Sequence, residues 1–169
     1  MTVGVFCMVN TRKVRDRRRL RFENFGEAIR DAETLADAER CGTLRATGNW
    51  SLGQAIGHVA TWARFPLDGY PLMPRPPWFI RMLIPFMAGT YLDKGLPAGV
   101  KIGNVPGGTF GTEPMEADCA IRDLREAFGR LARQAPTQPN PILGELSHEE
   151  WIKLNLRHAE LHFSFLHPE

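Results

Sequence analysis

Four segments of this chain place apolar residues three and four positions apart, and that spacing constrains the fold more than any other feature. It is the spacing of one face of an α-helix, whereas no segment shows the alternation typical of a β-strand. Three of the segments follow a capping-box pattern, a short polar residue three positions before Glu or Gln: Asn24 with Glu27, Ser51 with Gln54, and Ser147 with Glu150. We therefore predict helices at residues 25–40, 52–65 and 149–166.

The fourth segment is expected to become helical near Pro114, after Thr112, and to stop at Pro136. Each predicted helix is apolar on one face only, so it must pack on its neighbours. Four such helices predict an all-α fold, a four-helix bundle.

The connection between the second and third predicted helices, residues 66–113, is rich in proline and glycine. A connection of that length in a compact domain is usually functional or contains structure of its own. We expect a short extra helix within Trp78–Leu92 and irregular chain around it. An up-up-down-down bundle needs a long crossover at this point, since a short turn joins only antiparallel neighbours.

The segment Arg12–Arg21 concentrates positive charge and contains a single acid, Asp16. The net charge of +2 is too small to indicate an anionic partner by itself. A nucleic-acid arm is one interpretation, but aromatic residues are not interleaved with the charges, so we favour a solvated and partly frayed segment. We divide the chain into a basic N-terminal extension, residues 1–21, and a helical bundle domain, residues 22–169.

The cysteine count gives no disulfide framework and no zinc ribbon, because the three cysteines lack CxxC spacing: Cys7, Cys41 and Cys119. Together with the lack of a signal-peptide pattern, this favours a reducing, cytoplasmic location. The longest apolar run, Trp78–Leu92, is interrupted by an arginine and a proline, so no membrane span is expected.

His158 and His162 lie one turn apart in the last predicted helix, and a helical wheel places both near the middle of its apolar face. Glu160 falls on the opposite side, where we interpret it as a surface carboxylate. Buried imidazoles need polar partners, and two neighbours cannot both be charged at low cost. A divalent metal meets that need, because rings at positions i and i+4 can reach one ion. The spacing alone is weak evidence, since most such pairs are ordinary core or surface histidines.

A third histidine, His58, lies in the second predicted helix at the edge of the apolar stripe, beside Trp62. If the second and fourth predicted helices are adjacent, His58 completes a facial set with one open position, as in catalytic rather than structural zinc sites. Taken alone, His58 is also explained as a boundary histidine bonded to a backbone carbonyl. His148, at the start of the last helix, and His167, in what we expect to be a frayed end, are weaker candidates.

Other residues are candidates for supporting roles around the histidines. Asn155 lies one turn before His158 and is a candidate to orient a ligand or bound water, although an ordinary buried amide explains it equally. Three charged residues of the crossover can approach the site: Asp68, Asp93 and Lys94. Three aromatic residues can form its apolar walls, as core packing also explains: Trp62, Trp151 and Phe165. No general base is singled out.

The stretches "GNWSLGQAIGHVA" and "EEWIKLNLRHAELHFSFL" resemble motifs of the DinB/YfiT-like superfamily of metalloenzymes. With "RRRLRF" and "LPAG" in this order, the chain resembles more narrowly the domain-of-unknown-function family 1569 (DUF1569), from about Met8 onward. The resemblance implies an up-up-down-down bundle and a divalent metal, zinc or nickel, held by His58, His158 and His162. Characterised relatives in the superfamily imply low-molecular-weight-thiol transfer or thiol-dependent isomerisation, and a homodimer.

Two main hypotheses for the function follow. In the first, the protein is an enzyme, and an open metal position activates a water or a thiol for hydrolysis of, or thiol transfer to, a small-molecule substrate. In the second, a non-catalytic bundle holds a structural metal, and the aromatics of "PRPPWFIRMLIPF" form a partner or homodimer surface. A structural metal requires a fourth protein ligand, and no cysteine is placed for it, which favours the enzyme. Nucleic-acid binding is a third and less favoured interpretation.

Overall fold

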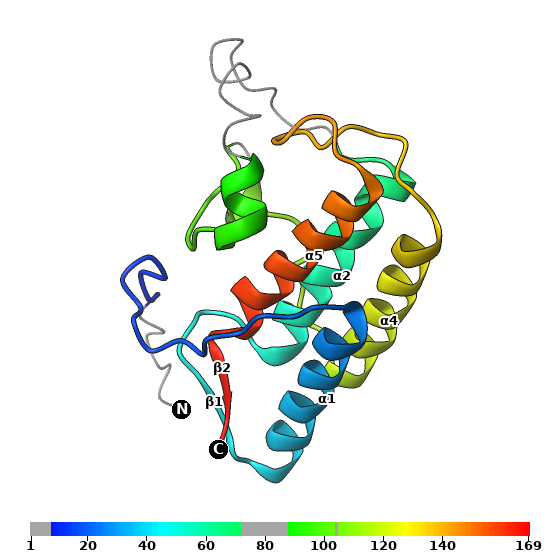
Figure 1. Ribbon diagram of the computed structural model, residues 1–169. Coiled ribbons are helices and arrows are strands. Elements are labelled where there is room, and N and C mark those ends of the chain that lie inside the picture. The colour runs from blue at the N-terminus through cyan, green and yellow to red at the C-terminus, as the bar shows by residue number, and fades with distance from the viewer. Residues whose placement is uncertain (1–7, 72–87, 104) are drawn as a thin grey trace.

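The protein is predominantly helical, and four long helices form a bundle (Figure 1). This computed structural model describes residues 8–71, 88–103 and 105–169. The long helices are α1 (Phe25–Cys41), α2 (Leu52–Asp68), α4 (Ala117–Arg133) and α5 (His148–Phe163). Residues 88–94 are also helical, and η1 (Pro106–Gly108) is a 3₁₀ turn. Within the described ranges, no helix combines the length and the apolar character needed to cross a membrane.

The predicted helix starts are confirmed where a side chain caps the helix. The Asn24 side chain accepts a hydrogen bond from the N–H of Glu27, and Ser51 and Ser147 each complete a capping box. The start predicted near Pro114 is wrong by about one turn, because α4 begins at Ala117 without a side-chain cap. Sequence patterns locate such uncapped ends poorly.

The four long helices enclose a main hydrophobic core, and a second, smaller cluster lies where residues 88–92 meet the first part of α5. Helix α2 packs most extensively on α4 and also contacts α5, while α1 contacts α4 and α5. The start of α2 lies very close to the chain just before α4, since a Cβ built on Gly53 would lie 1.8 Å from the Met115 carbonyl oxygen. The contact between α2 and α5 is the one that matters for the site, because it joins the two helices that carry the predicted metal ligands.

A small sheet corrects the expectation of a strand-free chain. Strand β1 (Leu44–Ala46) pairs antiparallel with β2 (Leu166–Pro168), with Arg45 opposite His167. His167 therefore lies in a strand, and the expectation of a frayed C-terminal end is wrong. The sheet also explains why α5 ends at Phe163, three residues before the predicted end.

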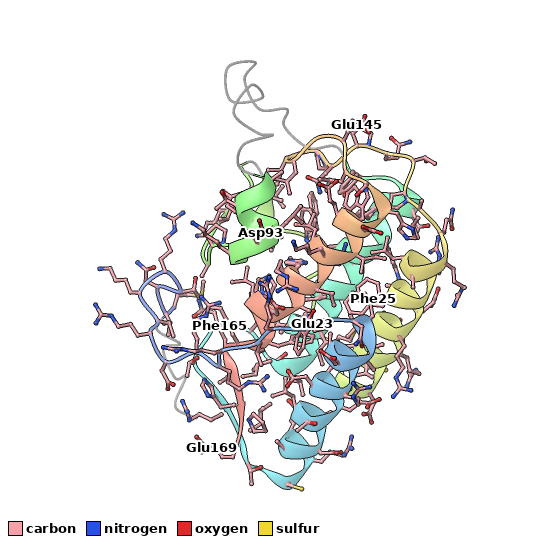
Figure 2. The ribbon with its side chains drawn as sticks, viewed as in Figure 1. Glu23, Phe25, Asp93, Glu145, Phe165 and Glu169 are labelled. Carbon is pink, nitrogen blue, oxygen red and sulfur yellow. The ribbon has the colours of Figure 1, made fainter. Side chains whose placement is uncertain are left out.

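Within the crossover the structure describes an α-helical segment at residues 88–94 besides the 3₁₀ turn η1, so most of the helix expected within Trp78–Leu92 lies outside the described residues. The aromatic surface expected at "PRPPWFIRMLIPF" lies outside them as well. Asp93, on this short helix, accepts a hydrogen bond from Lys153 of α5 at 2.6 Å and so links the crossover to the bundle (Figure 2).

The chain before α1 packs on the bundle in part, so the expectation of a solvated, frayed Arg12–Arg21 segment is wrong for two of its arginines. Arg18 forms a two-pronged ion pair with Asp31 of α1, at 2.8 and 2.6 Å. Arg17 donates to the Ser164 hydroxyl and lies over the Phe165 ring.

Glu160 is another correction, because it is buried rather than on the surface. Only 8% of the residue is exposed. Its carboxylate accepts the backbone N–H of Phe22 at 2.6 Å and pairs with Arg157 at 2.8 Å. The helical wheel missed this because the segment leading into α1 covers that side of α5.

Candidate metal centre

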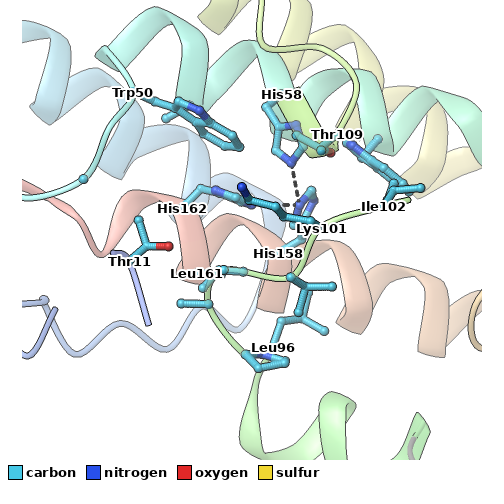
Figure 3. Close-up of a pocket in the computed structure, with 18 of the residues that line it drawn as sticks. Thr11, Trp50, His58, Leu96, Lys101, Ile102, Thr109, His158, Leu161 and His162 are labelled. Atoms are coloured by element: carbon cyan, nitrogen blue, oxygen red, sulfur yellow. Dashed lines mark hydrogen bonds between the residues drawn. The ribbon is translucent and has the colours of Figure 1, made fainter. Parts of the chain in front are cut away.

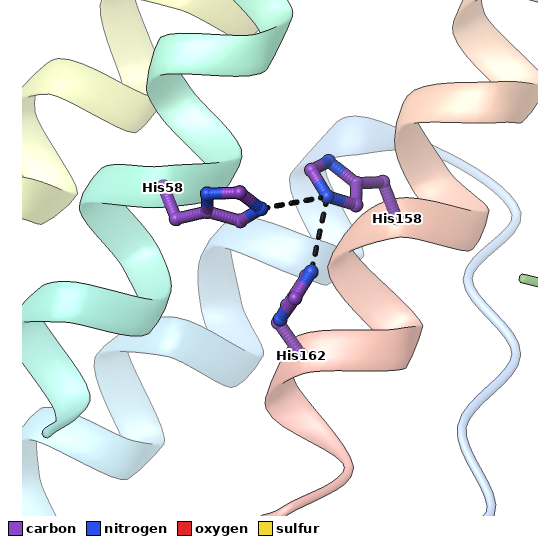
Figure 4. Close-up of side chains that lie close together, drawn as sticks. All are labelled: His58, His158 and His162. Atoms are coloured by element: carbon purple, nitrogen blue, oxygen red, sulfur yellow. Dashed lines mark hydrogen bonds between the residues drawn. The ribbon is translucent and has the colours of Figure 1, made fainter. Parts of the chain in front are cut away.

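The three histidines predicted as metal ligands come together in the structure (Figure 4). His58 is contributed by α2, and His158 and His162 by α5. The Nε2 atom of His158 lies 3.1 Å from that of His58 and 3.0 Å from that of His162. Among the described residues, these three can hold one metal ion, with all ligand atoms within 4.8 Å of one another.

The hydrogen bonding of His58 fixes which of its nitrogens is free. Its Nδ1–H donates to the Phe110 carbonyl at 2.7 Å, because a carbonyl can only accept. In the neutral ring the Nε2 lone pair is then free and points at His158. The bond to Phe110 agrees with the interpretation of His58 as a boundary histidine held by a backbone carbonyl. It agrees equally with the interpretation as a metal ligand, because a metal-ligating histidine usually donates its other ring N–H to a carbonyl or carboxylate.

A cation fits the resulting arrangement better than hydrogen bonds alone. A single proton on His158 Nε2 can point squarely at only one of its two neighbours, so at least one lone-pair contact lacks a full hydrogen bond. Nitrogens bound to one zinc ion at about 2.0–2.1 Å in tetrahedral geometry lie about 3.3 Å apart. Two of the three separations, 3.0 and 3.1 Å, are close to that value, and all three ligand atoms lie within 4.8 Å of one another.

All three rings favour the neutral form that binds metals. Burial lowers the pKa of His58 to about 4, against the smaller opposing effect of its bond to Phe110. Burial and the neighbouring histidines hold the pKa values of His158 and His162 well below the ordinary range. His58 is 3% exposed, whereas His158 and His162 are partly exposed and so remain reachable by a ligand. A metal therefore meets little competition from protons at neutral pH.

The histidines form part of the wall of a cavity of about 360 Å³ (Figure 3). Trp50, from the loop between β1 and α2, stacks on His162 at 4.9 Å between ring centres. All three predicted aromatic walls line the cavity: Trp62, Trp151 and Phe165. A cavity of this size accommodates a small organic molecule next to the three nitrogens.

The irregular part of the crossover supplies cavity residues that sequence reasoning missed. Lys101, Ile102 and Thr109 line the cavity, and the neighbouring Phe110 carbonyl orients His58 (Figure 3). Met8 and Thr11 approach from the N-terminal segment. The length and composition of the crossover suggested a functional role, but no periodic pattern could identify which of its residues face inward.

The charged crossover residues that the sequence offered lie elsewhere. Asp68 forms a two-pronged ion pair with Arg130, and Asp93 pairs with Lys153. Neither these carboxylates nor Lys94 line the cavity. His148 has the local role expected of it, since its Nε2 bonds to the Leu131 carbonyl at 2.6 Å.

Asn155 lines the cavity and is 4% exposed. Its amide nitrogen donates to the Trp151 carbonyl one turn earlier, at 2.9 Å. That bond fixes the amide and leaves its oxygen as an acceptor, so the role of orienting a ligand stays a prediction.

Comparison with protein families gives one finding that covers nearly the whole chain. Residues 14–169 match the family model described as "Protein of unknown function (DUF1569)". Searches among curated proteins and among solved structures gave no match. The match includes all three clustered histidines, and the chain belongs to the DUF1569 family.

Proposed function

We propose that this protein is a metal-dependent enzyme in which His58, His158 and His162 hold a divalent ion, zinc or nickel. The observation that carries the proposal is the convergence of three neutral imidazole nitrogens beside a cavity of small-molecule size. When bound, such an ion supplies Lewis acidity, which lowers the pKa of a coordinated water or thiol.

The number of donors favours an enzyme over a non-catalytic bundle with a structural metal. Structural zinc sites are usually closed by four protein ligands, whereas catalytic sites keep one position open. Within the described ranges the donor group contains three histidines and no further histidine, cysteine or carboxylate. The free cysteines Cys41 and Cys119 do not line the cavity.

The lining of the cavity favours thiol transfer over hydrolysis. Hydrolysis most often relies on a histidine or carboxylate that takes up or delivers protons, and the described lining residues contain no aspartate, no glutamate and no histidine beyond the three proposed ligands. A thiol needs less assistance, because its ordinary pKa of about 8.5 is already close to neutrality. In the proposed reaction the thiol loses its proton to water, and the resulting thiolate sulfur attacks an electrophilic carbon. A C–S bond forms while the bond to the leaving group breaks, and the leaving group departs with that electron pair. The aromatic walls limit access of water, which would compete with the thiol.

The test begins with tag-free protein, reconstituted with zinc or nickel and checked for bound metal. Conjugation of glutathione or cysteine to 1-chloro-2,4-dinitrobenzene is then measured beside hydrolysis of p-nitrophenyl acetate. We expect metal-dependent conjugation that is lost in His158→Ala and kept in His148→Ala. Hydrolysis alone would assign the hydrolase type. A bound metal with four protein ligands in X-ray absorption spectra would favour the non-catalytic bundle.

The wider relations implied by the resemblance also belong to this proposal. They are the membership of the DinB/YfiT-like superfamily, the up-up-down-down order of the helices, and a homodimer. Light scattering after size-exclusion chromatography tests the homodimer, and a monomeric mass at micromolar concentration would contradict it.

A further inference from the structure

The charge balance of the cavity is one-sided, and this suggests what the cavity binds. Among its described lining residues, Lys101 is the one lysine or arginine, and there is no aspartate or glutamate. Lys101 is exposed to solvent at the rim of this apolar cavity, so an anionic ligand that enters the cavity can pair with it.

Lys101 is held at the cavity by the turn that follows it. Its aliphatic stem passes Gly108 so closely that a Cβ there would lie 3.0 Å from Lys101 Cγ. Gly108 also has a φ of +84°, which favours glycine, and its carbonyl accepts the N–H of Ile102 at 2.7 Å. In the close-up view the Lys101 side chain extends across the cavity, over the histidine rings (Figure 3).

The ring of Trp62 forms part of the wall of the same cavity. The indole N–H of Trp62 is buried and has no hydrogen-bond partner in the described part of the chain. This donor has almost no accessible surface, so the cavity uses Trp62 as an apolar wall rather than as a hydrogen-bond donor. Most other side chains of the wall are aliphatic or aromatic, among them Tyr70, Tyr91 and Leu161.

We propose that the cavity binds an amphipathic organic anion, with an apolar body against the aromatic walls and a carboxylate paired with Lys101. The proposal rests on the proposed function in one respect, because it places this ligand beside the metal and so makes it the class of substrate. The ion pair with Lys101 does not itself need a metal.

The experiment compares a carboxylate with its neutral amide at matched size: 4-phenylbutanoate and 4-phenylbutanamide. Binding of each is measured by isothermal titration calorimetry at pH 7, with zinc-loaded and with chelator-treated protein. The variants are Lys101→Gln, which removes the charge, and Lys101→Arg, which keeps it. Lys94→Gln is the matched control, an exposed lysine of the same crossover outside the cavity. Circular dichroism checks that each variant is folded.

We expect the wild type to bind the carboxylate about two- to fivefold more tightly than the amide even without metal, as a solvent-exposed ion pair provides. Lys101→Gln should remove this preference, while Lys101→Arg and Lys94→Gln should retain it. A preference that is unchanged in Lys101→Gln, equal affinities in the wild type, or no binding of either compound would each overturn the proposal.

The two proposals fail separately. If the protein binds zinc but does not prefer the carboxylate, the assignment of Lys101 is wrong and the metal site stands. If it binds no metal but shows a Lys101-dependent preference, the metal-dependent function is wrong and the anion site stands.

Discussion

Replacing His158 with alanine is expected to abolish stabilisation by zinc while leaving the helical fold intact. The Nε2 atom of His158 contacts the Nε2 atoms of both His58 and His162, at 3.1 and 3.0 Å. A metal that binds only the folded state stabilises it by about 2.7 kcal/mol when the free metal is at about 100 times its Kd. In a chain of 169 residues, 1 kcal/mol shifts the midpoint of thermal unfolding by about 2–4 °C. Zinc should therefore raise the wild-type midpoint by about 5–11 °C.

The loss expected in the variant follows from the same relation. Removing a partner that merely orients a ligand costs about 10–100-fold in metal affinity, so removing the ligand itself should cost at least about 100-fold. At the same zinc concentration the stabilisation then falls to about 0.4 kcal/mol, a shift of about 1–2 °C. Scanning calorimetry of tag-free protein, with and without zinc after chelation, measures this difference.

The control for this experiment is His148→Ala. His148 bonds to the Leu131 carbonyl and is not among the clustered ligands, so its loss should lower stability without changing the increment from zinc. Two results would refute the reasoning. One is a full zinc increment in His158→Ala, and the other is no increment in the wild type with zinc, nickel or manganese.

Three further predictions concern the surroundings of the histidines. Gly111→Ala should weaken zinc binding in calorimetric titrations by about 10–100-fold, because an added Cβ would lie 2.6 Å from Thr61 Oγ1 and displace the adjacent carbonyl that orients His58. Gly107→Ala, with a similar φ of +71° and open space around it, is the control, and equal affinities of the two variants would contradict the idea. Glu160→Ala should lower the free energy of unfolding in urea by about 3–5 kcal/mol, because it leaves a buried guanidinium unpaired; a loss below about 1 kcal/mol would argue against that. Metal-free protein should lose stability as the pH falls from about 6.5 toward 4. The reason is the lowered pKa of His58, because the His58 ring takes up a proton less readily in the folded protein than in the unfolded chain. His58→Gln should lose about 3 kcal/mol less over that range, whereas an unchanged pH profile would exclude this origin.

The parts of the fold that the sequence predicts are those specified by residues close together in the chain. A capping box involves residues three positions apart, so Ser51 and Ser147 identified the starts of α2 and α5. The shared face of His158 and His162 follows from the helical repeat in the same way. The meeting of these rings with His58 required the further assumption that the two helices are adjacent, which the structure confirms.

The features that sequence reasoning missed depend on contacts between distant segments. Strands β1 and β2 have three residues each, too few for an alternating pattern to be recognised, and they pair across more than 100 positions. The wheel of α5 assigned Glu160 to solvent, because a wheel contains no information on the chain that covers a helix. The backbone N–H that Glu160 accepts comes from Phe22, 138 positions away.

The bundle and the crossover supply different parts of the candidate site, and this explains why a three-histidine cluster alone does not define a reaction. The helices fix the three nitrogens through two regular elements, which gives a metal a defined position but no preference for one substrate over another. The crossover supplies the residue that orients His58 and the cation, Lys101, that completes the cavity. These contacts come from the described residues 101–103 and 105–111, where Gly108 and Gly111 adopt positive φ angles and lie close to side chains. Because chain of this kind tolerates change more readily than a packed core, we expect proteins with the same three histidines to differ in substrate through this segment. Exchanging residues 96–111 between two such proteins should therefore transfer the ligand preference. Zinc affinity should change only as far as the hydrogen bond from His58 to the Phe110 carbonyl is altered. An exchange that left ligand preference with the helices would show that the bundle itself selects the substrate.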